Sequence, residues 1–284
     1  MADTLASIKR GYTDGPFGQI HYRIAGEPSD HTPLLLMHPS PLSGVVWDGF
    51  ISEIGRDRIA VAPDTPGFGE SAPPKSEPEI ADYAKAMATF LEHQDLKSVD
   101  IMGYHTGSLI ALEMARLFPD LVRKAVMISA TVFTADETEA FRAKYTTETV
   151  DEKGEGLTDR WQFIKEFWRD EPDDARRWQI FIEGQRNHGV MHWGHRAAFN
   201  YHHAENLPKV RQPVLVLNFG DDLTEPTARA AKHLANGHIE DLPHYSHGSI
   251  DVHKVSIAAR LRDFFDRPRA PLSKGKSHPK PAPT

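Results

Sequence analysis

The most constraining feature of the sequence is a sharp turn between an apolar strand and a helix. Val99–Gly103 is predicted to be a strand, and helical spacing of apolar residues follows from Ser108. Gly103 and Gly107 flank His105, and such small residues allow a tight turn with a closely packed helix. The residue in the middle of this turn is expected to be strained, with its side chain above the sheet.

Short apolar strands alternate with helices along most of the chain, which predicts a mostly parallel, doubly wound α/β sheet. An opening hairpin is expected at 11–26, and the helical stretch 131–207 carries no strong strand pattern. We therefore expect an inserted helical cap above the strand ends, where open α/β sheets bind ligands. The predicted divisions are a core of residues 1–130 and 208–267, a cap of 131–207 and a disordered tail of 268–284.

The composition limits the protein's compartment and partners. The 284 residues include no cysteine, so disulfides, thiolate metal sites and a cysteine nucleophile are excluded. No apolar run is long enough to span a membrane, and the N-terminus lacks the apolar stretch of a signal peptide. The net charge of -7 disfavours nucleic-acid binding. We expect a cytoplasmic protein with a small-molecule substrate and no nucleic-acid or membrane partner. A homodimer is possible.

Five segments, in order, resemble motifs of the α/β-hydrolase superfamily, specifically its capped, single-domain members. The resemblance covers nearly the whole chain outside the cap and tail. It rests on two loops, the His-Pro-Ser-Pro loop at 38–41 and the Asp-x-Pro-Gly-x-Gly-x-Ser loop at 64–71, and on the Gly-x-His-x-Gly turn at 103–107. The other two motifs are the acid after a late strand, at 221–222, and the last histidine loop, at 244–248. The turn resembles the family's nucleophile elbow, with His105 where serine, cysteine or aspartate is usual.

The resemblance implies a role for each motif. The backbone amides of Ser40 and Thr106 would form the oxyanion hole, since Pro39, which replaces the usual glycine, is not the donor. His247 would be the catalytic histidine, with His244 as the weaker match. Its acid would be Asp222, although the neighbouring Asp221 is the alternative because the usual spacing is missing.

His105 allows three interpretations, because an imidazole at the elbow prevents the ordinary triad. In the first, which we favour, it is an acid, base or hydrogen-bonding group beside His247 and Asp222. In the second it attacks the substrate covalently and forms an acyl-imidazole. In the third the nucleophile is lost and the fold only binds a ligand, although the oxyanion loop and the His247–Asp222 pair then have no obvious purpose.

Several of the 16 histidines and many aromatic residues fall in the cap. His188, His192 and His195 could share helix faces, but carboxylates at metal-site spacing are missing, so no metal is expected. We instead expect polar and aromatic side chains to line a substrate pocket, as side chains of this kind usually do. The candidate substrate-binding residues are His38, Tyr104, Trp161, His192, Trp193 and Tyr201.

The sequence thus predicts a cofactor-independent enzyme that acts on a small carbonyl compound. An ester, a lactone or a C–C bond next to a carbonyl would be cleaved with His105, His247 and Asp222 as catalytic residues. One alternative is a cofactor-free lyase, isomerase or oxygenase that uses the His–Asp pair as a base. The other is a non-catalytic ligand-binding protein of the same fold.

Overall fold

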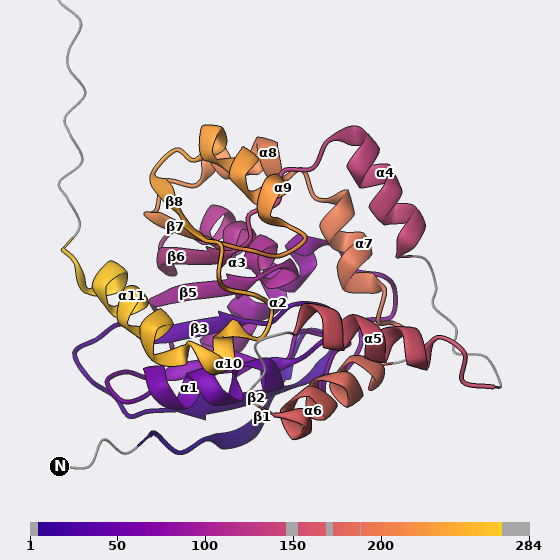
Figure 1. The fold of residues 1–284 in the computed structure, drawn as a ribbon. Coiled ribbons are helices and arrows are strands. Elements are labelled where there is room, and N and C mark those ends of the chain that lie inside the picture. The colour runs from indigo at the N-terminus through magenta and orange to yellow at the C-terminus, as the bar shows by residue number, and fades with distance from the viewer. Residues whose placement is uncertain (1–4, 146–152, 169–172, 188, 269–284) are drawn as a thin grey trace, which may run out of the picture.

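An eight-stranded sheet runs through the centre of the protein (Figure 1). The computed structural model describes residues 5–145, 153–168, 173–187 and 189–268. The strand order is β1-β2-β4-β3-β5-β6-β7-β8; β1 and β2 form an antiparallel hairpin, β2 pairs antiparallel with β4, and the other pairs are parallel. The strands are β1 (Lys9–Gly15), β2 (Gly18–Ala25), β3 (Leu34–Met37), β4 (Ala60–Pro63), β5 (Val99–Tyr104), β6 (Val122–Ile128), β7 (Val214–Phe219) and β8 (Gly237–Leu242). The predicted α/β-hydrolase type of sheet is confirmed.

Helices cover both faces of the sheet, which explains why its central strands are unbroken apolar runs. In β3, Leu35 and Met37 pack into the hydrophobic cluster with the helices α2 and α3, whereas Leu34 and Leu36 pack into the opposite cluster with α1 and α11. The covering helices are α1 (Asp48–Ile54), α2 (Ile80–His93), α3 (Thr106–Leu117), α9 (Thr224–Ala228), α10 (Ser249–Val252) and α11 (Lys254–Asp266). Within the described residues, none of the helices has the length and apolarity needed to cross a bilayer.

Two of the predicted helices are shorter or more broken than the apolar pattern indicates. The sequence pattern predicts one helix at 226–235, but the helix begins earlier, as α9, and continues as the 3₁₀ helix η3 (Arg229–His233). Pro226 lies in the first turn of α9, where a missing N–H costs no helical hydrogen bond. The closing helix is divided into α10 and α11 at His253.

Between β6 and β7 the chain forms helices, and most of them gather at one end of the sheet (Figure 1). They are α4 (Ala135–Lys144), α5 (Leu157–Phe167), α6 (Asp174–Gln185), α7 (Trp193–Asn200), α8 (His203–Asn206) and the short 3₁₀ helix η2 (Leu207–Lys209). Another 3₁₀ helix, η1 (Gly44–Trp47), lies between β3 and α1. The domain boundaries at 130 and 208 stay predictions. Residues 269–284 of the expected tail lie outside the described residues.

Asp64 organises the loop that follows β4. Its buried carboxylate accepts hydrogen bonds from the backbone amides of Gly44 at 2.8 Å and Glu70 at 3.0 Å, and it contacts His21 at 2.8 Å and Arg23 at 3.2 Å. Burial alone would raise the pKa of Asp64, but these hydrogen bonds and positive charges hold it below its usual value. The Asp-x-Pro-Gly-x-Gly-x-Ser segment is therefore a rigid wall beside the strand ends.

The turn at His105 requires glycine on both sides because backbone approaches it closely. A Cβ on Gly103 would lie 2.2 Å from the carbonyl oxygen of Gly107, and one on Gly107 would lie 2.2 Å from that of Met37. These contacts are with backbone, so they cannot be relieved by turning a side chain. The turn is thus fixed against the end of β3.

We predict that Gly107→Ala lowers the free energy of unfolding by about 1–3 kcal/mol, because the added methyl group displaces backbone. Urea unfolding followed by circular dichroism measures this change. Gly184→Ala in α6 is the matched control, since its Cβ would make only an ordinary 3.7 Å contact with Leu42. Equal stability of the Gly107→Ala variant and the wild type would contradict the close packing of the turn.

Candidate functional site

The site begins at the turn between β5 and α3. His105 has φ 48° and ψ −112°, a conformation that residues other than glycine rarely adopt. Its backbone N–H donates to Ile128 at 3.0 Å, and its carbonyl accepts from the amide of Ser108 at 2.8 Å. Hydrogen bonds on both sides therefore hold the strained backbone, and the imidazole, 16% exposed, faces the pocket described below.

Ser40 and Thr106, the predicted oxyanion-hole residues, line the same pocket as His105. His38, predicted to bind substrate, is instead buried beneath this loop. Its Nδ1–H donates to the carbonyl of Pro39 at 3.1 Å, and its Nε2 accepts from the amide of Thr65 at 2.9 Å. Burial lowers the pKa of His38, so the ring is neutral and connects the loop of Ser40 to the Asp64 loop.

Two imidazole–carboxylate pairs lie next to each other at the strand ends. His105 Nε2 is 3.3 Å from Asp221 Oδ2, and His247 Nε2 is 3.4 Å from Asp222 Oδ1. The two rings meet edge to face with centroids 4.9 Å apart. The expected His247–Asp222 contact is present, and the neighbouring aspartate, considered only as an alternative acid, contacts the other histidine.

The two aspartates differ in their exposure but share a direction of pKa shift. The side chain of Asp221 is 1% exposed and that of Asp222 is 35% exposed. Burial would raise both pKa values, but the hydrogen bonds with His105 and His247 hold both below the usual range. Because an ionised carboxylate only accepts hydrogen bonds, each histidine carries its proton on Nε2.

His247 is held from two further directions. The hydroxyl of Tyr104 lies 3.1 Å from its Nδ1 and 3.2 Å from its carbonyl oxygen, and the ring of Trp168 stacks on it at a centroid distance of 4.9 Å. Burial lowers the pKa of His247, although the contact with Asp222 opposes this shift. The ring is therefore neutral, with its position fixed by Tyr104, Trp168 and Asp222. His244, the weaker match in sequence, is exposed.

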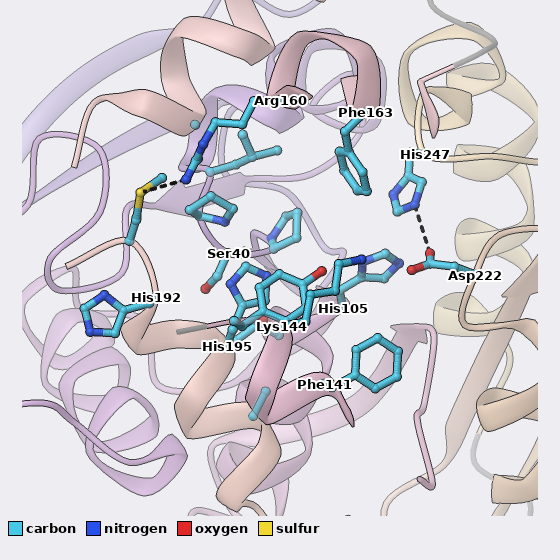
Figure 2. Close-up of a pocket in the computed structure, with 18 of the residues that line it drawn as sticks. Ser40, His105, Phe141, Lys144, Arg160, Phe163, His192, His195, Asp222 and His247 are labelled. Atoms are coloured by element: carbon cyan, nitrogen blue, oxygen red, sulfur yellow. Dashed lines mark hydrogen bonds and ion pairs between the residues drawn. The ribbon is translucent and has the colours of Figure 1, made fainter. Parts of the chain in front are cut away.

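A cavity of about 380 Å³ opens beside these rings and receives side chains from both the sheet end and the helices α4 to α7 (Figure 2). This volume lies within the range of small-molecule sites. His105, Asp222 and His247 line it together with Ser40 and Thr106. Its remaining wall is largely apolar and includes Leu42, Phe141, Phe163, Ile164, Phe181 and Phe199.

The other predicted substrate-binding residues are divided between this wall and the interior. His192 lines the cavity. Trp161 packs edge to face against Trp178 and Phe181, and the hydroxyl of Tyr201 donates to Glu113 at 2.8 Å. In the described part of the chain, the lining residues do not include Tyr104, Trp161, Trp193, Tyr201 or His38.

Three side chains could hold a metal ion, and they are not the cap histidines considered from sequence. One ligand atom from each of His105, Asp221 and His247 lies within 4.8 Å of the others. Two imidazoles and a carboxylate suit a divalent transition metal. Coordination would use ring lone pairs that proton transfer also needs, so the two uses of this cluster are alternatives. His188 lies outside the described residues, and the expected absence of a metal stays a prediction.

The sequence analysis missed several residues of this site. Trp168 and the pocket cations Lys144 and Arg160 belong to the charged, aromatic-rich stretch, where residue type alone did not separate pocket from surface. The sequence did contain a signal for the Asp221–His105 contact. Asp221 and Asp222 are adjacent, and adjacent residues after a strand point in different directions, so each could contact a different histidine.

Comparison with known proteins gives the same fold across the chain. The sequence model of the alpha/beta hydrolase fold family matches residues 32–251. Non-heme chloroperoxidase of Burkholderia pyrrocinia is 28% identical over 274 residues, which cover 87% of this chain and 95% of that protein. An uncharacterized protein of Mycobacterium tuberculosis is 31% identical over 121 residues, but the match covers 43% of this chain and only 35% of that protein.

Solved structures agree in fold at low sequence identity. The enol-lactonase from Burkholderia xenovorans LB400 has a TM-score of 0.76 and 16% identity, covering 90% of this chain and 100% of that chain. A thermophilic esterase from Thermogutta terrifontis has a TM-score of 0.71 and 19% identity, covering 91% and 98%. These likenesses concern the fold, and what the site does has to be argued from its own residues.

Buried histidines make stability depend on pH. Burial lowers the pKa of His195 to about 3 and that of His203 to about 4. An unfolded histidine has a pKa of about 6.5, so the unfolded chain binds these protons first as the pH falls. The stability from the neutral rings is complete above about pH 6.5 and is lost below it, at up to about 1.4 kcal/mol per pH unit for each ring.

We predict that His195→Phe, which preserves an aromatic ring stacked on Tyr145, reduces the loss of unfolding free energy between pH 6 and pH 4 by about 1–2 kcal/mol. Urea titrations at both pH values measure the difference. His238→Gln, at an exposed position of β8, is the control and is expected to retain the wild-type slope. A His195→Phe variant with an unchanged slope would show that this ring does not stay neutral in the fold.

Proposed function

The chain belongs to the α/β-hydrolase enzyme family, and we propose that it cleaves a small ester, a lactone or a C–C bond next to a carbonyl, without a cofactor. His105 replaces the usual elbow nucleophile in this reaction, and the His247–Asp222 pair assists it. The cytoplasmic location, the small-molecule substrate and a homodimer stay predictions. Names of relatives such as enol-lactonase and esterase fit this class of substrate.

One observation carries the proposal: the elbow residue is an imidazole paired with its own carboxylate at the floor of the pocket. Since Nε2–H of His105 is donated to Asp221, the lone pair of the neutral ring is on Nδ1. A histidine oriented by an aspartate in this way is the arrangement that general bases use. His105 therefore acts on protons rather than as a bystander left after loss of a serine.

The reaction follows from this assignment. His105 Nδ1 takes a proton from a water molecule, and the water oxygen attacks the substrate carbonyl carbon. The carbonyl oxygen gains negative charge and accepts hydrogen bonds from the amides of Ser40 and Thr106. When the tetrahedral intermediate collapses, the imidazolium returns its proton to the leaving alkoxide, and the products are an acid and an alcohol.

The neighbouring groups stabilise the charged form of the base. A protonated His105 lies beside Asp221 and within reach of Asp222, and both carboxylates have pKa values that keep them ionised. His247 is neutral and restrained by Tyr104, so it orients Asp222 and fills the space beside His105. The His247–Asp222 pair therefore contributes negative charge and holds neighbouring side chains in position, and the His105–Asp221 pair carries out the proton transfer.

We predict that His105→Ala and Asp221→Asn lower kcat for p-nitrophenyl ester hydrolysis by about 10²–10⁴-fold, the range for loss of a general base. Asp222→Asn is expected to cost less, since it does not contact the proton-transferring ring. The matched control is Asp241→Asn on β8, which hydrogen-bonds Asn218 away from the pocket. Full activity of both the His105→Ala and the Asp221→Asn variant would overturn the proposal.

Trapping an acyl-enzyme intermediate distinguishes covalent attack by His105 from general-base catalysis. An acyl-imidazole on His105 adds the mass of the acyl group, which rapid acid quench and mass spectrometry detect. A general base leaves the protein mass unchanged during turnover. We expect no adduct in the wild type, and an acyl adduct on His105→Ser would show that the oxyanion amides also support a serine ester.

A second candidate function keeps the same base but adds no water. His105 Nδ1 could remove a proton next to a carbonyl, with the oxyanion amides stabilising the enolate, as cofactor-free lyases, isomerases or oxygenases require. The observation that favours it is the absence of a hydroxyl or thiol at the elbow position, which base-only chemistry does not need. Turnover in ¹⁸O-labelled water discriminates, since hydrolysis places the label in the acid product. Tight binding with no product from any carbonyl substrate would favour the non-catalytic alternative.

A further inference from the structure

The pocket carries cations on the side of the cap helices. Lys144, at the end of α4, and Arg160, in the first turns of α5, both line it. Its lining carboxylates are Asp222, which is in contact with His247, and Asp159, whose residue is exposed. The imidazole–carboxylate pairs therefore lie at the sheet end of the pocket, and Lys144 and Arg160 enter it from the cap helices.

Arg160 reaches toward the cavity from α5. In Figure 2 its guanidinium lies on the opposite side of the drawn residues from His247 and Asp222, with Ser40 and His105 at intermediate positions. Its Nη2 donates to the sulfur of Met191 at 3.4 Å. Burial lowers the pKa of Arg160, which remains fully charged at neutral pH and is held in a largely apolar wall.

The field of these cations reaches the interior of the pocket. His195, on α7, lines the wall and stacks on Tyr145 at a centroid distance of 4.2 Å. Burial is the largest cause that lowers the pKa of His195 to about 3, and the positive charges of Arg160 and Lys144 lower it further. The smaller contributions of Arg160 and Lys144 indicate that their positive potential reaches this part of the wall, and such a potential favours an anion.

We propose that Arg160 binds a carboxylate group of the substrate, at the opposite end from the carbonyl that reacts at His105. The position of the reacting carbonyl rests on the proposed function. The wall between the two ends is apolar and includes Leu42, Phe163 and Phe181. The substrate class is thus an apolar or aromatic carboxylate that bears an ester or lactone carbonyl at its other end.

The chemistry of the guanidinium supports a carboxylate over other polar groups. Its planar fork donates two parallel hydrogen bonds to one carboxylate, which adds direction to charge attraction. The apolar surroundings weaken solvent screening of this pair, and Lys144 adds a second positive charge among the lining residues. A neutral amide of equal shape would gain neither advantage.

The test uses a probe that cannot be turned over. Binding of 3-phenylpropanoate and of the isosteric 3-phenylpropanamide to the full chain is measured by isothermal titration calorimetry. We expect the wild type to bind the acid at least about tenfold more tightly than the amide, as one charge-assisted pair provides. Arg160→Gln is expected to abolish the preference, and Arg160→Lys to retain part of it because charge remains but the fork is lost.

The matched control is Lys165→Gln, which removes one positive charge from the exposed face of the same helix and is expected to retain the full preference. Equal binding of acid and amide by the wild type would overturn the proposal, and so would a preference that survives in Arg160→Gln. If Arg160→Gln fails to fold, the wild-type ratio and the Arg160→Lys variant decide. Because binding is measured without turnover, loss of the acid preference rejects only this subsite, whereas full ester hydrolysis by His105→Ala rejects only the proposed function.

Discussion

The strained backbone at His105 is the constraint from which the site is built. Gly103 and Gly107 allow carbonyl oxygens to approach to distances that any Cβ would prevent, so β5 turns directly into α3 against the end of β3. The turn places the side chain of His105 above the strand ends and its neighbour Thr106 beside the loop of Ser40. Hydrogen bonds on both sides of the turn offset the conformational free energy that a positive φ costs at a residue with a side chain.

A histidine at this turn changes how the remaining side chains divide their roles. An ordinary elbow nucleophile needs one histidine and one acid, and here each of two imidazoles has an acid of its own. Asp221 and Asp222 are adjacent in the chain, yet one is buried against His105 and the other is partly exposed against His247. The buried pair can move protons inside the pocket, while the second pair is restrained by Tyr104 and Trp168.

The sequence predicted the sheet, the turn and the His247–Asp222 contact, because each depends on local spacing at a strand end. It did not predict that Asp221 pairs with His105, since a one-residue difference after a strand does not indicate which ring each carboxylate meets. Tyr104 was expected to bind substrate, but it alternates to the face below the turn, where its hydroxyl meets His247. In the cap, aromatic residues form both the pocket wall and the helix contacts, so residue type alone could not separate Phe163 from Trp161.

The central claim is that the elbow imidazole is a neutral base whose Nε2 proton belongs to Asp221. Long-range ¹H–¹⁵N correlation spectra of histidine rings measure it directly, because they distinguish the two tautomers and the protonated ring. At neutral pH the account predicts that His105 carries its proton on Nε2 with a bare Nδ1, and that Asp221→Asn disturbs this tautomer while Asp222→Asn does not. A His105 ring with its proton on Nδ1, or a tautomer indifferent to Asp221, would contradict it.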